Sequence, residues 1–332
     1  MNILTTAGDA AADPVVTTHR VAPQTMLAIS IAEGKRLLRH PVLLAGAALG
    51  AVLSIQPWLG GEPAQDWETL NYLTFLLGWA PLYLAAFLVA NMAALRERET
   101  TTAEMFRSYP TRYAERTLAL LAAGLVPTGL ATALAAIQLS VIAQAGGIAV
   151  GDQLVPLTPT VVEMAWVPAT TAAAFASGVA IARAVRSLAF SAIIAAVTTF
   201  IFFIMFWAVS WFPVYFVTPY ATSLRALDLG EHLTGDELTK TGVLSGPSYD
   251  TGSDHWSVVV RDIATVGWHN VYLIGLALLL AAYALRRSGR DPRVRWLLLA
   301  GTVFAIGGLT MHMATLGGPF VWWELVHGLE VF

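Results

Sequence analysis

The chain has 332 residues, of which 56% are hydrophobic and only 12% are charged. Soluble domains contain about 25% charged residues, so this composition excludes an ordinary soluble protein and predicts an integral membrane protein. The absence of cysteine excludes disulfides and thiolate metal sites, and the net charge of −3 says little because its two signs lie in different loops.

The N-terminal region divides into a polar tail and an amphipathic segment. Residues 1–23 lack an apolar core, which predicts a disordered cytoplasmic tail. The segment 24–41 has apolar residues at near-helical spacing and a group of cations, as expected for a helix that lies in the membrane interface. The apolar residues are Leu27, Ile31 and Leu38, and the cations are Lys35, Arg36 and Arg39.

Seven apolar runs follow this segment. A helix needs about 20 apolar residues to cross a hydrocarbon core of about 30 Å. We therefore predict an all-α polytopic membrane protein with about seven transmembrane helices, at 42–59, 70–95, 117–143, 161–182, 188–211, 266–285 and 296–317. The first run contains Gly46-x-x-x-Gly50, a motif that permits close helix approach, although small residues are common throughout this Ala-rich chain.

The basic residues predict the orientation of the spans. All but Arg225, Lys240 and Arg261 of the 19 Lys and Arg residues fall in four short stretches, which occupy every second gap between the apolar runs. Because basic loops stay on the cytoplasmic side, the N-terminus is predicted to be cytoplasmic and the C-terminus external. After five spans in 42–211, the stretch 212–265 becomes an extracytoplasmic segment with aromatic interfacial helices. The region 266–332 holds two further spans and an external tail.

A short helix is predicted in the cytoplasmic loop after the second span. Thr101-x-x-Glu104 is a capping box, in which each side chain satisfies a backbone N–H at the start of a helix. Pro110 disfavours helix at the residue before it, so the helix has room for about two turns, 102–108.

This helix would present Met105, Phe106 and Arg107 to the cytosol. An exposed apolar pair beside a cation suits insertion into a groove of another protein. The alternative is a plain connector whose Met and Phe side chains dip into the membrane interface, and the residues by themselves favour neither interpretation.

The arrangement resembles that of ABC-2 type permeases, the membrane subunits of one class of ATP-binding-cassette exporters. Glu33-Gly-Lys-Arg-Leu-Leu-Arg-His-Pro looks like the opening of that family, and Arg98-Glu99 through Pro110-Thr-Arg112 is similar to its segment after the second span. Long aromatic elements between the fifth and sixth spans complete a resemblance that covers about 24–285. The chain departs from the family in its seventh span and in having Thr100 or Thr101 where a glycine is common.

The resemblance implies a permease subunit that works as a homo- or heterodimer with separate nucleotide-binding ATPase subunits and moves an amphipathic or hydrophobic cargo outward by alternating access. It implies an ATPase contact at the short helix, through Thr101, Glu104, Met105, Phe106 and Arg107. ATP and Mg²⁺ would bind on the partner, because the chain has no Gly-x-x-x-x-Gly-Lys-Ser/Thr loop, and we expect no enzymatic activity in the chain itself.

Few polar side chains lie within the spans. None of the spans has a carboxylate or cation at mid-depth, which disfavours a proton- or ion-coupled transporter. Asn91 and Gln138 are candidates for a substrate path, although polar residues in spans also form hydrogen bonds between helices.

Histidines near the outer ends of the last two spans offer the remaining chemistry. His269, Met311-His-Met313 and His327 are residue types that suit copper or haem, so a copper-handling or haem-binding membrane subunit of a larger complex is the alternative function. The simpler interpretation is an interfacial histidine among lipid-facing methionines, and we therefore assign no metal site and keep His269 and His312 as minor candidates.

Overall fold

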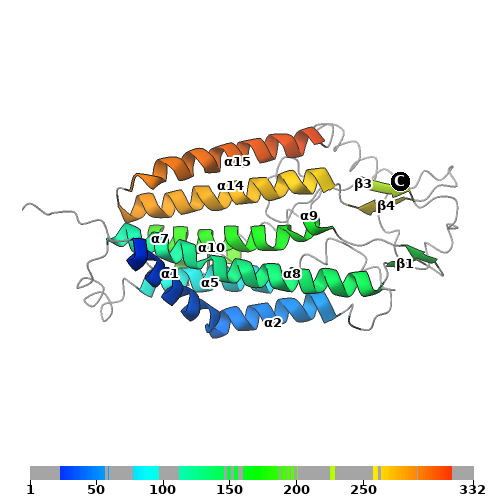
Figure 1. Ribbon diagram of the computed structural model, residues 1–332, viewed down its shortest axis with the longest axis horizontal. Helices are drawn as coiled ribbons and strands as arrows, with labels where there is room; N and C mark the ends of the chain where they lie inside the picture. Colours follow the sequence, from blue (N-terminus) through cyan, green and yellow to red (C-terminus); the bar gives the residue numbers. More distant parts are fainter. Residues whose placement is uncertain are drawn as a thin grey trace, which may run out of the picture.

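The computed structural model describes residues 23–56, 78–96, 112–145, 160–185, 263–289 and 291–315, with four short strands and single residues at 59 and between 187 and 200. Most of these residues form helices that run side by side in one elongated bundle (Figure 1). The helices are α1 (Pro23–Leu38), α2 (Pro41–Ile55), α5 (Ala80–Arg96), α7 (Tyr113–Ala123), α8 (Leu125–Ala145), α9 (Val161–Met164), α10 (Trp166–Ala184), α14 (Ile263–Ser288) and α15 (Arg293–Thr315).

Four helical stretches are long and apolar enough to cross a membrane, namely Tyr113–Ala145, Val161–Ala184, Val266–Ser288 and Arg293–Thr315. The pair α1 and α2 makes a fifth candidate if it is counted as one bent span. The described part of the chain therefore shows a membrane-spanning helical protein with four to five candidate spans, and it does not confirm the predicted count of seven. The difference has two causes: α2 and α5 have only 15 and 17 residues, and 188–211 lies largely outside the described residues.

The N-terminal helix is separate from the first apolar helix. The axes of α1 and α2 differ by 57° across a break of two residues. Pro41 occupies the first turn of α2, where its missing N–H costs nothing, and the His40 side chain accepts a hydrogen bond from the Val42 backbone N–H at 3.3 Å. A change of direction at this point is what a helix lying in the interface before a span requires.

Two short antiparallel strand pairs accompany the helices, and the described structure is otherwise helical, as predicted. Strands β1 (Ile148–Val150) and β2 (Gln153–Val155) pair with each other, as do β3 (Arg225–Asp228) and β4 (Ser257–Val260). Figure 1 shows β1, β3 and β4 beyond one end of the helices. Both pairs lie outside the predicted spans, in connecting segments, so they do not change the helical class.

Helix α10 lies at the centre of the bundle, in contact with α5, α8 and α14. Small residues permit these close contacts: a Cβ atom on Gly178 of α10 would lie only 2.3 Å from the carbonyl oxygen of Phe87 on α5. The predicted close approach at Gly46-x-x-x-Gly50 is confirmed, since a Cβ on Gly46 would meet Ala85 of α5 at 2.3 Å.

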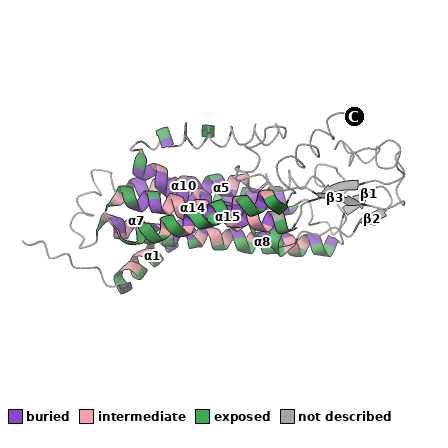
Figure 2. Cartoon of the chain, turned by 90° about the horizontal axis from the view of Figure 1, so that it is seen from above, coloured by how far each residue is buried: buried purple, intermediate pink, exposed green. Residues whose placement is uncertain are grey.

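Helix α15 is the peripheral member. It packs mainly against α14, and most of its remaining surface is exposed (Figure 2). Its buried residues are Gly301, Ala305, Gly308 and His312, which form one stripe toward α14. The exposed face is apolar, as a helix facing lipid requires.

Candidate functional site

The predicted contact residues for an ATPase lie outside the described residues. Thr101, Glu104, Met105, Phe106 and Arg107 all belong to the segment between α5 and α7. The structure does describe both ends of that segment, at Arg96 and at Arg112. How those ends are held determines which helices would move with the segment.

An ion pair holds the first end. Nη2 of Arg96, the last residue of α5, lies 2.7 Å from Oε1 of Glu33 on α1, and both side chains are largely shielded from solvent. The same carboxylate oxygen lies 3.7 Å from Nη1 of Arg36, one turn further along α1. Helix α1 is thereby attached to the C-terminal end of α5 by a charge-assisted hydrogen bond, which is stronger than a bond between neutral groups.

Arg183 near the end of α10 holds the second end. Its guanidinium lies over the ring of Tyr113, the first residue of α7, at 4.2 Å from the ring centroid, and donates a hydrogen bond to the Tyr113 hydroxyl. It also donates to the backbone carbonyl of Ala94 on α5 at 3.1 Å. Arg183 is only 2% exposed, so one buried cation joins α5, α7 and α10.

Further contacts support the start of α7. The Glu115 carboxylate accepts a hydrogen bond from the backbone N–H of Arg112 at 2.9 Å, which caps the helix. One turn later, the Thr117 and Ser288 hydroxyl oxygens are 2.8 Å apart, linking α7 to α14. We call Glu33, Arg96, Tyr113 and Arg183 the anchoring cluster, because they tie both ends of the 97–111 segment to the bundle.

The two polar candidates for a substrate path make contacts between helices. Gln138 on α8 accepts a hydrogen bond from the Trp79 indole at 3.0 Å and donates to the carbonyl of Ser54 on α2 at 2.6 Å. The Asn91 amide on α5 donates to the carbonyl of Gly178 at 3.1 Å. Both side chains are fully buried. Both side chains therefore form hydrogen bonds between packed helices.

The two minor metal candidates lie against each other. His269 on α14 and His312 on α15 are fully buried, and their Nδ1 atoms are 3.3 Å apart. The His312 side chain points into the contact between the two helices. His327 lies outside the described residues.

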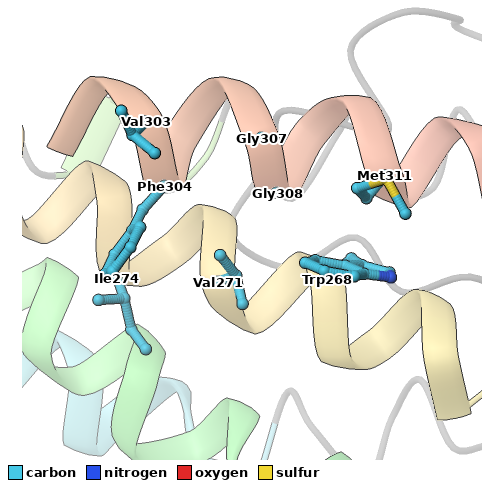
Figure 3. Close-up of a pocket in the computed structure, with 8 residues that line it drawn as sticks. All are labelled: Trp268, Val271, Ile274, Val303, Phe304, Gly307, Gly308 and Met311. Atoms are coloured by element: carbon cyan, nitrogen blue, oxygen red, sulfur yellow. The ribbon is translucent and has the colours of Figure 1, made fainter. Parts of the chain in front are cut away.

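An apolar groove of about 380 Å³ lies beside this histidine pair, between α14 and α15 (Figure 3). Trp268 and Met311, the neighbours of the two histidines in the chain, face each other at one end of it. The other lining residues are Val271, Ile274, Val303, Phe304, Gly307 and Gly308. None of these lining residues carries a charge, so the groove offers only apolar contact.

Sequence reasoning missed the anchoring cluster. Glu33 is the lone carboxylate among the cations of 24–41, and Arg183 directly follows a predicted span, so both were assigned to interfacial or loop surfaces. An isolated opposite charge in a basic segment was the available signal for Glu33. Arg183 gave no such signal, because its partners are an aromatic ring and a carbonyl group.

Comparison of the chain with protein-family models, curated proteins and solved structures finds no match. The functional argument therefore depends on the geometry described above.

Proposed function

We propose that the chain is the membrane subunit of an ATP-driven exporter of the ABC-2 type, which moves an amphipathic or hydrophobic substrate by alternating access. A separate nucleotide-binding subunit carries ATP and Mg²⁺, and a second permease subunit completes the dimer. In this proposal the chain spans the cell membrane seven times, with its N-terminus in the cytoplasm.

The anchoring cluster is the observation that supports this function best. Alternating access requires that a push on a cytoplasmic element tilts several spans together. The 97–111 segment is attached at Arg96 to α1 and at Tyr113 to α10, and Arg183 adds a direct link to α5. A force on the segment would therefore move α1, α5, α7 and α10 as a unit. A loop that only connects two spans would not need a buried cation such as Arg183 at its end.

The alternative haem function receives no support from the histidine pair. A haem iron held by two histidines lies between their nitrogens, with the porphyrin plane separating the two rings. The rings of His269 and His312 are in direct contact at 3.3 Å, which leaves no room for a macrocycle between them.

The proposed ATPase contact can be tested by crosslinking. Because the chain has no cysteine, one cysteine at Met105 can carry a photoreactive maleimide in native membranes. We expect this probe to crosslink to a protein that is also labelled by a photoreactive ATP analogue. A cysteine at Ser245, in the predicted extracytoplasmic segment, is the control and should give no such product.

The double substitution Met105→Asp with Phe106→Asp tests the same contact by affinity. Each apolar side chain contributes about 1.5–3 kcal/mol when it is fully buried, so the pair should account for most of a modest docking interface. We expect the variant to insert and dimerise normally but to lose its ATP-binding partner on purification. A double variant that retains the partner and its ATP hydrolysis would contradict the proposed function.

A further inference from the structure

The histidine pair forms a polar site inside an otherwise apolar helix contact. His269 and His312 are 43 positions apart in the chain and lie on two antiparallel helices. Their ring centroids are 5.1 Å apart, and the ring planes are nearly perpendicular. Buried polar groups within a membrane cost free energy, so they commonly mark a function. The Tyr272 ring lies 5.7 Å from that of His269 and closes one side of the site.

Backbone packing sets the distance between the two rings. A Cβ on Gly275 of α14 would lie 2.3 Å from the backbone nitrogen of Ala305, and a Cβ on Gly308 of α15 would lie 2.5 Å from that of Tyr272. These glycines bring the helix backbones into direct contact on the same face as the histidines. The imidazoles are consequently held close together by the fold, which is the arrangement that a preorganised ligand pair needs.

The separation fits one bound metal ion. Imidazole nitrogens bind transition metals at about 2.0–2.1 Å, so two nitrogens on one tetrahedral ion are about 3.3–3.4 Å apart. The observed Nδ1 to Nδ1 distance is 3.3 Å. An ion could therefore bind both nitrogens after small side-chain movements.

The charge of the surroundings and the type of ligand atom determine which metal ion the pair would bind. The described residues contain no group of three or more His, Cys, Asp or Glu side chains that could hold a metal, so no carboxylate there offsets a second positive charge. A divalent ion would bring two charges into apolar surroundings, and a monovalent ion brings only one. Imidazole is a suitable ligand for copper, and copper in its monovalent state meets this charge limit. Met311 and Met313 lie about 100° to either side of His312 on the helix, and Met311 faces Trp268 in the apolar groove, so the ligands are the two imidazoles.

We propose that His269 and His312 bind one Cu(I) ion between α14 and α15. The proposal does not depend on the permease function. The competing explanation is a direct N–H···N hydrogen bond that only fastens α15 to α14, and it predicts no affinity for metal.

A metal titration of the full-length purified protein in detergent separates the two explanations. Under anaerobic conditions, Cu(I) is titrated against the chromogenic chelator bicinchoninate, with Ag(I) as a redox-inert second probe. The chain contributes no thiol background because it has no cysteine. We expect one ion per chain, and X-ray absorption of the copper-loaded protein should show histidine nitrogen ligands. An absence of binding, or copper without nitrogen ligands, would overturn the proposal.

Variants locate the site. Gln keeps an amide that can hydrogen-bond but is a poor ligand for Cu(I), so His269→Gln and His312→Gln should each weaken binding by at least about 100-fold, since even outer-shell substitutions cost 10–100-fold. His40→Gln, the same change at the start of α2, should leave the affinity unchanged. Unchanged affinity in the two folded site variants would place the ion elsewhere and refute the assignment. If either variant fails to fold, a variant with Gln at the other five histidines leaves only His269 and His312, and loss of binding in that variant would refute the assignment.

Discussion

The Glu33 carboxylate and the Arg96 guanidinium are 2.7 Å apart, although 63 positions separate them in the chain. This contact attaches the N-terminal helix α1 to the end of α5. Arg96 also directly precedes the 97–111 segment, which we propose as the ATPase contact. The strength of the ion pair therefore matters for both stability and coupling.

Reversing the two charges tests this ion pair. We expect Glu33→Arg and Arg96→Glu each to lower the free energy of unfolding by about 1–3 kcal/mol, because each leaves like charges at a partly shielded contact. The double variant should recover most of the loss. A double-mutant cycle on apparent melting temperature in detergent measures the coupling, with Arg39→Glu, an exposed position just after the end of α1, as control. Strictly additive losses would show that the pair contributes nothing.

The second prediction concerns Arg183. Lysine keeps the charge but loses the planar group that covers Tyr113 and reaches Ala94 at the same time. We expect Arg183→Lys to reduce stability by about 2 kcal/mol or more, from the lost cation–π contact and a charged hydrogen bond. The exposed Arg287→Lys should change it by less than about 0.5 kcal/mol. Thermal unfolding of the two variants side by side is the measurement, and equal melting temperatures would contradict the role of Arg183.

Glycines provide a matched pair for testing helix packing. A methyl group on Gly178 would collide with the Phe87 carbonyl, whereas one on Gly129 would meet nothing within 4 Å. Gly178→Ala should therefore destabilise the protein by about 1–3 kcal/mol through overpacking. Gly129→Ala should be neutral or slightly stabilising, because alanine favours helix by up to about 1 kcal/mol. Similar melting curves for the two variants would mean that α5 and α10 do not approach each other this closely.

The predicted orientation can be measured with single cysteines. In intact cells, an impermeant maleimide should label a cysteine at Ser245 but not one at Arg290, because the charge pattern places 212–265 outside and 286–295 inside. Permeabilised cells should label both positions and serve as the control. The opposite pattern would invert the proposed topology.

A tag after Phe332 tests the seventh span separately. If α15 crosses the membrane, the tag should be accessible from outside in intact cells. Protection of the tag until lysis would mean that α15 does not cross or that an earlier span was miscounted.

The sequence by itself determined the class of the molecule. Long apolar runs can satisfy their backbone hydrogen bonds in a membrane only as helices, so length and hydropathy suffice to predict α8, α10, α14 and α15. The break before α2 was also predictable, because Pro41 disfavours helix at the residue before it and fits the first turn of a new helix. These features depend on residues that are neighbours in the chain.

Only the tertiary structure decided which polar residues meet. Gln138 bonds to Trp79 and to Ser54, His269 lies against His312, and Arg183 covers Tyr113. Nothing in the local pattern of a nearly uniform apolar helix specifies its neighbour. The rotation and pairing of the helices follow from contacts between small residues such as Gly178 and Gly275, whose partners lie far away in the sequence.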